Sequence, residues 1–212
     1  MRIVIDPHIH TNSSPDSSIT PNQLLDGMLA SGINAIAVTD HDTMEGYRRF
    51  KHSYTFREFL MIPGIEVTTD LGDIIVLGLK DPPITKDAEL LIDLAHEAGG
   101  LVVAPHPFDG SRVSLGERCG TLKVDLIETA NGKCRSDSNR QAKEFSAVLG
   151  LPGIGGSDAH ERNQIGTVVD VLECEKNLES VLEGLRKGAK VTSSPRLKPG
   201  ASHFLAQACQ SP

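Results

Sequence analysis

The chain has no tryptophan, and aromatic residues make up only 4% of its 212 residues. Proteins that bind single-stranded nucleic acid stack bases on exposed aromatic rings, so such a platform is not expected here. Basic residues are also too few for a nucleic-acid-binding face, because the net charge is −7 and the densest basic segments are only 48–51 and 196–198. A small anionic substrate remains compatible with this charge, since bound cations can supply local positive charge.

Cysteine is scarce and widely spaced, at Cys119, Cys134, Cys174 and Cys209, with no C-x-x-C pair. This spacing disfavours a zinc knuckle or a redox dithiol and is typical of reduced thiols in a cytosolic protein. The chain begins with a strand-like segment at 2–6 rather than a signal peptide, and no apolar run is long enough to cross a bilayer. We therefore expect a cytoplasmic protein with no membrane segment.

The chain does contain a regular alternation of short apolar runs and amphipathic segments, over a length that suits one domain. Strands are expected at 2–6, 33–39, 59–66, 73–79, 101–104, 124–129, 151–155, 167–171 and 190–192. Helices are expected between Thr20 and Gly32 and at 87–98, 137–149 and 177–187. The alternation predicts right-handed crossovers and a parallel sheet over residues 1–192, with 193–212 as a tail.

Histidines and carboxylates stand at or just after the ends of these expected strands. The carboxyl ends of parallel strands share one edge of a sheet, where α/β folds place their active sites. Imidazole and carboxylate groups without thiolates favour Zn, Mn or Fe. Each motif alone has an ordinary explanation, as a surface pair or a turn, but their recurrence at one end of the strands favours a metal site. The residues concerned are His8, His10, Asp16, Asp40, His41, Glu66, His106, Glu128, Asp158 and His160.

In order and spacing these motifs resemble those of the polymerase-and-histidinol-phosphatase (PHP) superfamily, over nearly all of residues 1–192. The matching segments are Asp6-x-His8-x-His10-Thr11, Thr39-Asp40-His41-Asp42, Pro63-Gly64-Ile65-Glu66, His106-Pro107 and Gly156-Ser157-Asp158-Ala159-His160. The resemblance implies a single-domain, distorted (β/α)7 barrel. It also implies phosphoester hydrolysis with two or three divalent ions, which could be Zn, Mn or Fe, with Mg also possible.

The resemblance further implies which residues hold each ion. The first ion would be held by His8, His10, Glu66 and Asp158; the second by Glu66, as a bridge, and His106; the third by Asp16, His41 and His160. Asp6 and Asp40 would be carboxylates that orient imidazoles from behind. Asp40, Asp158 and His160 are expected to take part in catalysis.

One departure from the family pattern concerns the second ion. Relatives often carry a histidine just before the apolar-Leu-Gly end of the strand that follows the glutamate, and Ile75 stands in that place here. The second site would then be weak, be empty, or recruit Glu128 or Asn131. Glu128 could equally be a carboxylate that lies behind the ligands.

We expect a metal-activated hydroxide to attack phosphorus without a Ser or Cys nucleophile. The expected substrate is a small phosphorylated metabolite, such as a nucleotide, a sugar phosphate or an amino-alcohol phosphate, with Arg135 and Arg162 as its phosphate contacts. A PHP-type nuclease is an alternative that the acidic charge disfavours. Two further alternatives are a non-catalytic metal-binding module, suggested by Ile75, and a metal-dependent amidohydrolase. The amidohydrolase is disfavoured by the Asp158-Ala159-His160 motif and by the lack of a lysine suited to bridge two ions.

Overall fold

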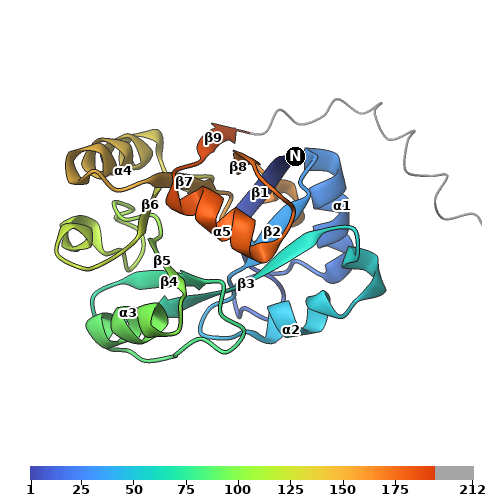
Figure 1. The fold of residues 1–212 in the computed structure, drawn as a ribbon, viewed down its shortest axis with the longest axis horizontal. Helices are drawn as coiled ribbons and strands as arrows, with labels where there is room; N and C mark the ends of the chain where they lie inside the picture. Colours follow the sequence, from blue (N-terminus) through green and yellow to red (C-terminus); the bar gives the residue numbers. More distant parts are fainter. Residues whose placement is uncertain (194–212) are drawn as a thin grey trace, which may run out of the picture.

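Nine strands form one sheet that curls into a nearly closed barrel in the computed structural model, which describes residues 1–193 (Figure 1). The strands are β1 (Arg2–Ile9), β2 (Ala35–Val38), β3 (Leu60–Thr68), β4 (Asp73–Leu77), β5 (Leu101–Ala104), β6 (Leu126–Asn131), β7 (Gly153–Gly156), β8 (Val168–Glu173) and β9 (Lys190–Ser193). Their order in the sheet is β7-β6-β5-β4-β3-β2-β1-β8-β9. The segment after β7 returns to the end of β1, where the Asp158 amide donates to His8 O (2.8 Å) and the His10 amide to Ala159 O (3.0 Å). The predicted distorted α/β barrel is therefore confirmed.

The strands β1, β2, β3, β5, β6 and β7 run in one direction, but β4 and β8 run against their neighbours. The prediction of a wholly parallel sheet is wrong for these two strands. The turn between β3 and β4 spans only residues 69–72, which is too short for the crossover that a parallel pair needs. The strands that carry the predicted site residues all belong to the parallel set, so their carboxyl ends still meet at one end of the barrel.

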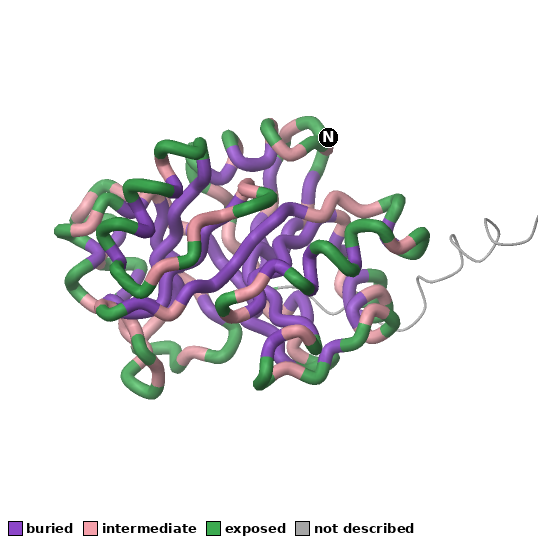
Figure 2. The backbone as a smooth tube through the Cα atoms, turned by 90° about the horizontal axis from the view of Figure 1, so that it is seen from below, coloured by how far each residue is buried: buried purple, intermediate pink, exposed green. Residues whose placement is uncertain are grey.

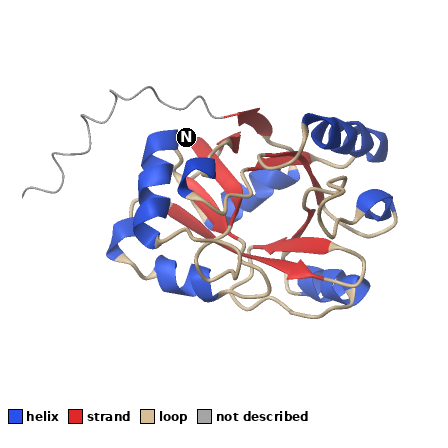
Figure 3. Ribbon diagram, turned by 180° about the vertical axis from the view of Figure 1, so that it is seen from behind, coloured by secondary structure: helices blue, strands red, loops and turns tan. Residues whose placement is uncertain are grey.

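The helices pack around this barrel, as the view from behind shows (Figure 3). They are α1 (Pro21–Ser31), α2 (Glu45–Lys51), α3 (Ala88–Glu97), α4 (Ser136–Leu149) and α5 (Leu178–Arg186), with 3-10 turns at Tyr54–Phe56, Gly116–Gly120 and Arg162–Gln164. A capping box between Thr20 and Gln23 starts α1, and Gly32, at φ 66°, ends it. The short helix α2 was not predicted.

The apolar core has two parts, and buried backbone runs through the middle of the molecule (Figure 2). The larger part lies between the strands and helices α1 to α4. The smaller part fills the barrel with residues from the beginnings of the strands, such as Ile3 and Ala35, and with Val181, Leu182 and Leu185 of α5. Helix α5 therefore closes the end of the barrel opposite to the carboxyl ends of the parallel strands.

Two sequence predictions concern the ends and surface of the molecule. The predicted tail, 193–212, lies outside the described residues except for Ser193, which ends β9. Within residues 1–193, no helix is long and apolar enough to cross a membrane.

Candidate metal centre

The first strand brings two histidines into the barrel through an irregularity in its pairing. Ile3 and Ile5 point into the barrel, so a regular strand would direct the following even-numbered residues outward. The register between β1 and β2 shifts between Asp6 and Ile9. This bulge reverses the alternation, so that His8 and His10 both face inward and Ile9 joins the outer core.

Glu66, near the end of β3, lies between two groups of imidazoles. Its Oε2 atom is 3.3 Å from His8 Nε2 and 3.1 Å from His10 Nε2. Its Oε1 atom is 3.0 Å from His106 Nε2. The Nε2 atoms of His8 and His10 lie 3.1 Å apart. Oε2 is also 3.4 Å from His41 Nδ1, so one oxygen of Glu66 faces three imidazoles and the other faces His106.

Asp158, after β7, connects this group to another at the rim. Its Oδ1 atom is 3.6 Å from His8 Nε2, 3.5 Å from His10 Nε2 and 3.4 Å from His160 Nδ1. Beyond it, Asp16 Oδ2 lies 2.9 Å from His160 Nε2 and 3.5 Å from His41 Nε2. The ligand-type atoms fall into three groups, each with all members within 4.8 Å of one another: His8, His10 and Asp158; His8, Glu66 and His106; and His10, Asp16, His41 and His160.

The first two groups are almost fully buried, whereas in the third Asp16 is 50% exposed and His41 25% exposed. Burial makes the charges of the first two groups costly unless they compensate one another. Burial lowers the pKa of His8, but the charges of Asp158, Glu128 and Glu66 raise it well above its ordinary value. Burial raises the pKa of Glu66, yet the surrounding histidines lower it well below the usual range. In the absence of metal, Glu66 is therefore favoured in its ionised form and His8 in its protonated form.

The site also holds backbone strain and unpaired polar atoms of the kind found where an ion binds. His106 and Asp158 adopt φ values of 31° and 53°, in the left-handed region that favours glycine. Among the described residues, His41 Nδ1 and Asp73 Oδ1 are buried without a hydrogen-bond partner. With a donor set of imidazole nitrogens and carboxylate oxygens, the residues fit a cluster of divalent ions.

Glu128 and Asn131 lie behind these groups rather than among them. Glu128 Oε1 is 2.9 Å from His8 Nδ1, the nitrogen that faces away from Glu66. Its Oε2 atom accepts hydrogen bonds from the His106 amide (2.7 Å) and from Asn131 Nδ2 (2.9 Å). Asn131 Nδ2 also lies 3.1 Å from Asp158 Oδ2. Both residues therefore hold the predicted ligands in place.

Asp6 and Asp40 hold backbone instead of the imidazoles that were predicted for them. Asp6 accepts hydrogen bonds from the amides of His8, Ser157 and Gly166. Asp40 accepts hydrogen bonds from the amide and hydroxyl of Thr11. Burial raises the pKa of Asp6 to about 6, although the hydrogen bonds from Ser157 and Gly166 oppose it. These two carboxylates join the loops that carry the histidines, and Glu128 is the one that contacts an imidazole from behind.

The basic residues at the site differ from those predicted. Arg162 pairs with Asp26 of α1 (3.4 Å) and is 59% exposed, and Arg135 is an exposed residue at the start of α4. Arg112, in the loop after β5, instead contacts Asp158 Oδ2, while Lys133 Nζ lies 3.1 Å from His160 Nδ1. Loop position alone does not separate these four residues, because the direction in which each long side chain extends depends on tertiary contacts.

Ile75 lies at the floor of the site. It pairs with Glu66 of β3 and Val103 of β5, so its side chain stands on the same face of the sheet as Glu66. It is 2% exposed and belongs to the apolar filling of the barrel. Apolar packing therefore begins directly below Glu66.

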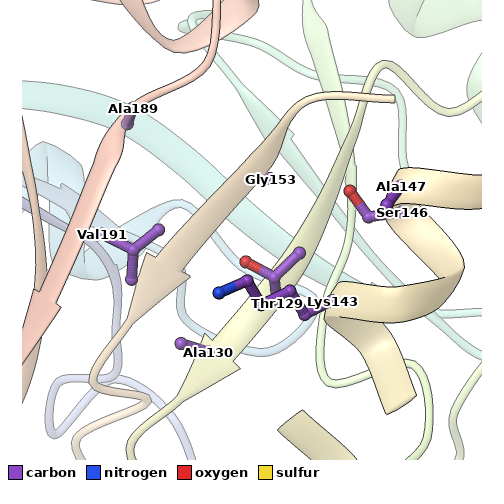
Figure 4. Close-up of a pocket in the computed structure, with 8 residues that line it drawn as sticks. All are labelled: Thr129, Ala130, Lys143, Ser146, Ala147, Gly153, Ala189 and Val191. Carbon is purple, nitrogen blue, oxygen red and sulfur yellow. The ribbon is translucent and has the colours of Figure 1, made fainter. Parts of the chain in front are cut away.

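A separate pocket lies away from the candidate metal centre, between strands β6, β7 and β9 and helix α4 (Figure 4). Its walls include Thr129, Lys143 and Val191. None of the predicted site residues lines it.

Comparisons with known proteins place the chain in a family. The model described as "PHP domain" matches residues 6–105, and the one described as "PHP-associated" matches residues 136–189. Two uncharacterized proteins of Methanocaldococcus jannaschii are similar to it. MJ1587 is 34% identical over 59% of this chain and 80% of its own length, and MJ0417 is 29% identical over 82% of this chain and 72% of its own length.

Solved structures of low sequence identity share the fold. A two-domain protein of Bacteroides vulgatus, containing a predicted PHP-like metal-dependent phosphoesterase, aligns with a TM-score of 0.71 at 21% identity, over 92% of this chain and 65% of that one. Endonuclease Q, in complex with a duplex that carries an abasic lesion, aligns with a TM-score of 0.70 at 18% identity, over 91% and 58%. An amidohydrolase of Chromobacterium violaceum with bound sulfate aligns with a TM-score of 0.65 at 17% identity, over 90% and 98%. The chain spans less than two thirds of the first two. On the family matches and this shared barrel, the chain belongs to the PHP domain family.

Proposed function

We propose that the protein is a metal-dependent phosphoesterase that hydrolyses a small phosphorylated metabolite, such as a nucleotide, a sugar phosphate or an amino-alcohol phosphate. The observation that carries the proposal is the position of Glu66, whose two oxygens face different imidazole groups. A carboxylate in this position would help to hold two ions, which would supply positive charge to the attacking and leaving oxygens of a phosphoryl transfer.

Each group of residues would hold one ion. His8, His10, Glu66 and Asp158 would hold the first; Glu66 and His106 the second; Asp16, His41 and His160 the third. When bound, such ions supply a nucleophile at neutral pH and positive charge for the phosphoryl oxygens. Burial, and then the charge of His10, lower the pKa of His160, so this imidazole is neutral and able to bind an ion or accept a proton at pH 7.

Arg112 and Lys133 are the proposed contacts for phosphate oxygens that no ion binds. Both reach residues of the cluster, Asp158 and His160. A guanidinium can bind two phosphate oxygens at once, whereas an ammonium acts as a point charge. They replace Arg135 and Arg162 in this role. Asp40, which was expected to act in catalysis, is instead proposed to hold the loop at Thr11.

The test is phosphate release from a panel of small phosphate esters by protein supplied with Mn²⁺ or Zn²⁺. We expect His8→Ala and Asp158→Ala to lower kcat/KM by more than about 100-fold. Removal of a residue that only supports a metal ligand typically lowers activity by about 10–100-fold, so loss of a ligand itself should exceed this. His52→Ala is the matched control, because His52 is exposed at the end of α2. A wild-type protein inactive with each ion on every ester would overturn the proposal.

A nuclease is a second candidate, favoured by the barrel shared with endonuclease Q. The net charge of −7 weighs against it, because binding to a phosphate backbone draws on many basic contacts. Incubation of labelled single and double strands with Mn²⁺ at moderate salt distinguishes the two. Degradation of strands faster than hydrolysis of small esters would favour the nuclease.

A further inference from the structure

Asp73 is the first residue of β4 and lies at the mouth of the barrel. It pairs with Thr68 of β3, just as Ile75 pairs with Glu66 two residues further along the two strands. Because side chains alternate along a strand, Asp73 and Ile75 share the face on which Glu66 lies. Asp73 therefore stands beside Glu66, one step nearer to solvent than Ile75, yet it is only 7% exposed.

The carboxyl of Asp73 has an oxygen with nothing to bind. Within residues 1–193, Asp73 Oδ1 is buried and has no hydrogen-bond partner. Burial raises the pKa of Asp73 and the charge of Glu66 raises it further, whereas a hydrogen bond with Thr68 and the charges of His106 and His41 oppose them. A buried acceptor of this kind is uncommon in folded proteins, and an ion is one of the few partners that would satisfy it.

The second ion is the one with too few ligands. His8 belongs to the group with His10 and Asp158 and to the group with Glu66 and His106. Its Nε2 atom lies near both His10 and Glu66, although one nitrogen can bind only one ion. If the first ion takes His8, the second retains only Glu66 and His106. Zinc and similar ions in catalytic sites ordinarily have three protein ligands and an open position. Ile75, directly below, has no donor atom.

We propose that Asp73 is the third protein ligand of the second ion, an inference that rests on the proposed function. Its free oxygen and its place on the face of Glu66 serve this role. Asp73 lies outside the three groups whose ligand atoms are within 4.8 Å of one another, so its side chain would turn toward Glu66 and His106 when the ion binds. With two carboxylates and one imidazole, the second site would be richer in oxygen than the first and would favour Mn²⁺ over Zn²⁺. The two sites would then differ both in metal affinity and in their preference for Mn²⁺ or Zn²⁺.

Calorimetric titration of metal-stripped, full-length protein with Mn²⁺ tests this proposal. We expect Asp73→Asn to weaken the weaker binding step by at least about 10-fold and to leave the tighter step unchanged. Asp73→His should restore the weaker step and shift its preference toward Zn²⁺. Asp93→Asn is the control, because Asp93 is an exposed carboxylate of α3 that pairs with Lys123.

Thermal melts separate this role from a structural one. In EDTA, Asp73→Asn should melt no lower than the wild type, because the free oxygen makes no hydrogen bond among the described residues. Addition of Mn²⁺ should raise the melting temperature of Asp73→Asn by less than it raises that of the wild type. The role of Asp73 would be overturned, without affecting the proposed function, if Asp73→Asn left both steps of Mn²⁺ binding unchanged. It would also be overturned if this variant melted at a lower temperature than the wild type in EDTA and Mn²⁺ raised the melting temperatures of both proteins equally. A wild type that binds no Mn²⁺ would overturn the proposed function as well.

Discussion

His8 Nδ1 lies 2.9 Å from Glu128 Oε1, although 120 residues separate the two along the chain. In this arrangement Nδ1–H donates to the carboxylate, so Nε2, on the side of Glu66 and Asp158, is the nitrogen that would bind an ion once it loses its proton. A carboxylate behind a metal-binding histidine fixes its tautomer and makes the ring a stronger ligand. Glu128 therefore decides how His8 is presented to an ion, without being a ligand itself.

Removal of this carboxylate should weaken metal binding without abolishing it. Glu128→Ala would leave His8 Nδ1 and the His106 amide without their acceptor, and Asn131 Nδ2 with Asp158 alone. We expect a 10–100-fold loss of Mn²⁺ affinity, measured by calorimetry, and a smaller loss for Glu128→Gln, which keeps an acceptor. Glu144→Ala, on the exposed side of α4, is the control. An unchanged affinity in Glu128→Ala would contradict this role.

Metal binding should become stronger as the pH rises. The pKa values of His8 and His10 are raised in the metal-free protein, because the carboxylates around them outweigh the effect of burial. Below those pKa values the imidazoles carry protons that an incoming ion must displace, so acid competes with metal. Titration at pH 7 in two buffers of different ionisation enthalpy should show a net release of protons. Binding without proton release would mean that these imidazoles are not ligands.

Arg112 should affect the binding of substrate more than the turnover of bound substrate. We expect Arg112→Ala to raise KM by about 10-fold or more, since an ionic hydrogen bond to phosphate is worth about 1.5–3 kcal/mol. Arg112→Lys should recover part of this loss, because an ammonium keeps the charge but not the bidentate geometry. The control is Arg162→Ala, which removes a surface pair with Asp26. Steady-state kinetics at saturating Mn²⁺ provide the comparison. An equal rise in KM for Arg112→Ala and Arg162→Ala would contradict the role of Arg112 in substrate binding.

Asp170 of β8 should make the stability of the wild type fall as the pH rises. It is fully buried, and its only described hydrogen bond is accepted by Oδ1 from the Gly155 amide (3.0 Å). Burial raises its pKa well above the ordinary value, so the protonated form is favoured in the folded state. This contribution is fully present below the ordinary carboxyl pKa and is lost as the pH rises through the folded value.

The comparison uses Asp170→Asn, which cannot ionise. In EDTA, the free energy of unfolding of this variant should increase relative to that of the wild type as the pH rises from 5 to 9. Urea denaturation at several pH values measures the difference. Parallel curves for the two proteins would show that Asp170 does not titrate in this range.

Local sequence was sufficient to predict the α/β alternation and the clustered residues, because each motif lies within a few residues of the end of its own strand. The barrel itself was implied by the resemblance to the PHP superfamily. The reversal of β4 was not predicted, since it depends on the short turn at 69–72 rather than on the pattern of the strand itself. The contact of Glu128 with His8 and the burial of Asp73 arise only when distant strands pair. For the same reason, the sequence did not distinguish Arg112 from Arg162.

The most direct test of the account is the anomalous diffraction of a crystal grown with Mn²⁺ or Zn²⁺. We expect at least two anomalous peaks inside the barrel mouth, one about 2.0–2.2 Å from ligand atoms of His8 and His10 and the other at a similar distance from Glu66 and His106. Peaks confined to surface carboxylates, in protein that still hydrolyses phosphate esters, would contradict the claim that these residues hold the catalytic ions.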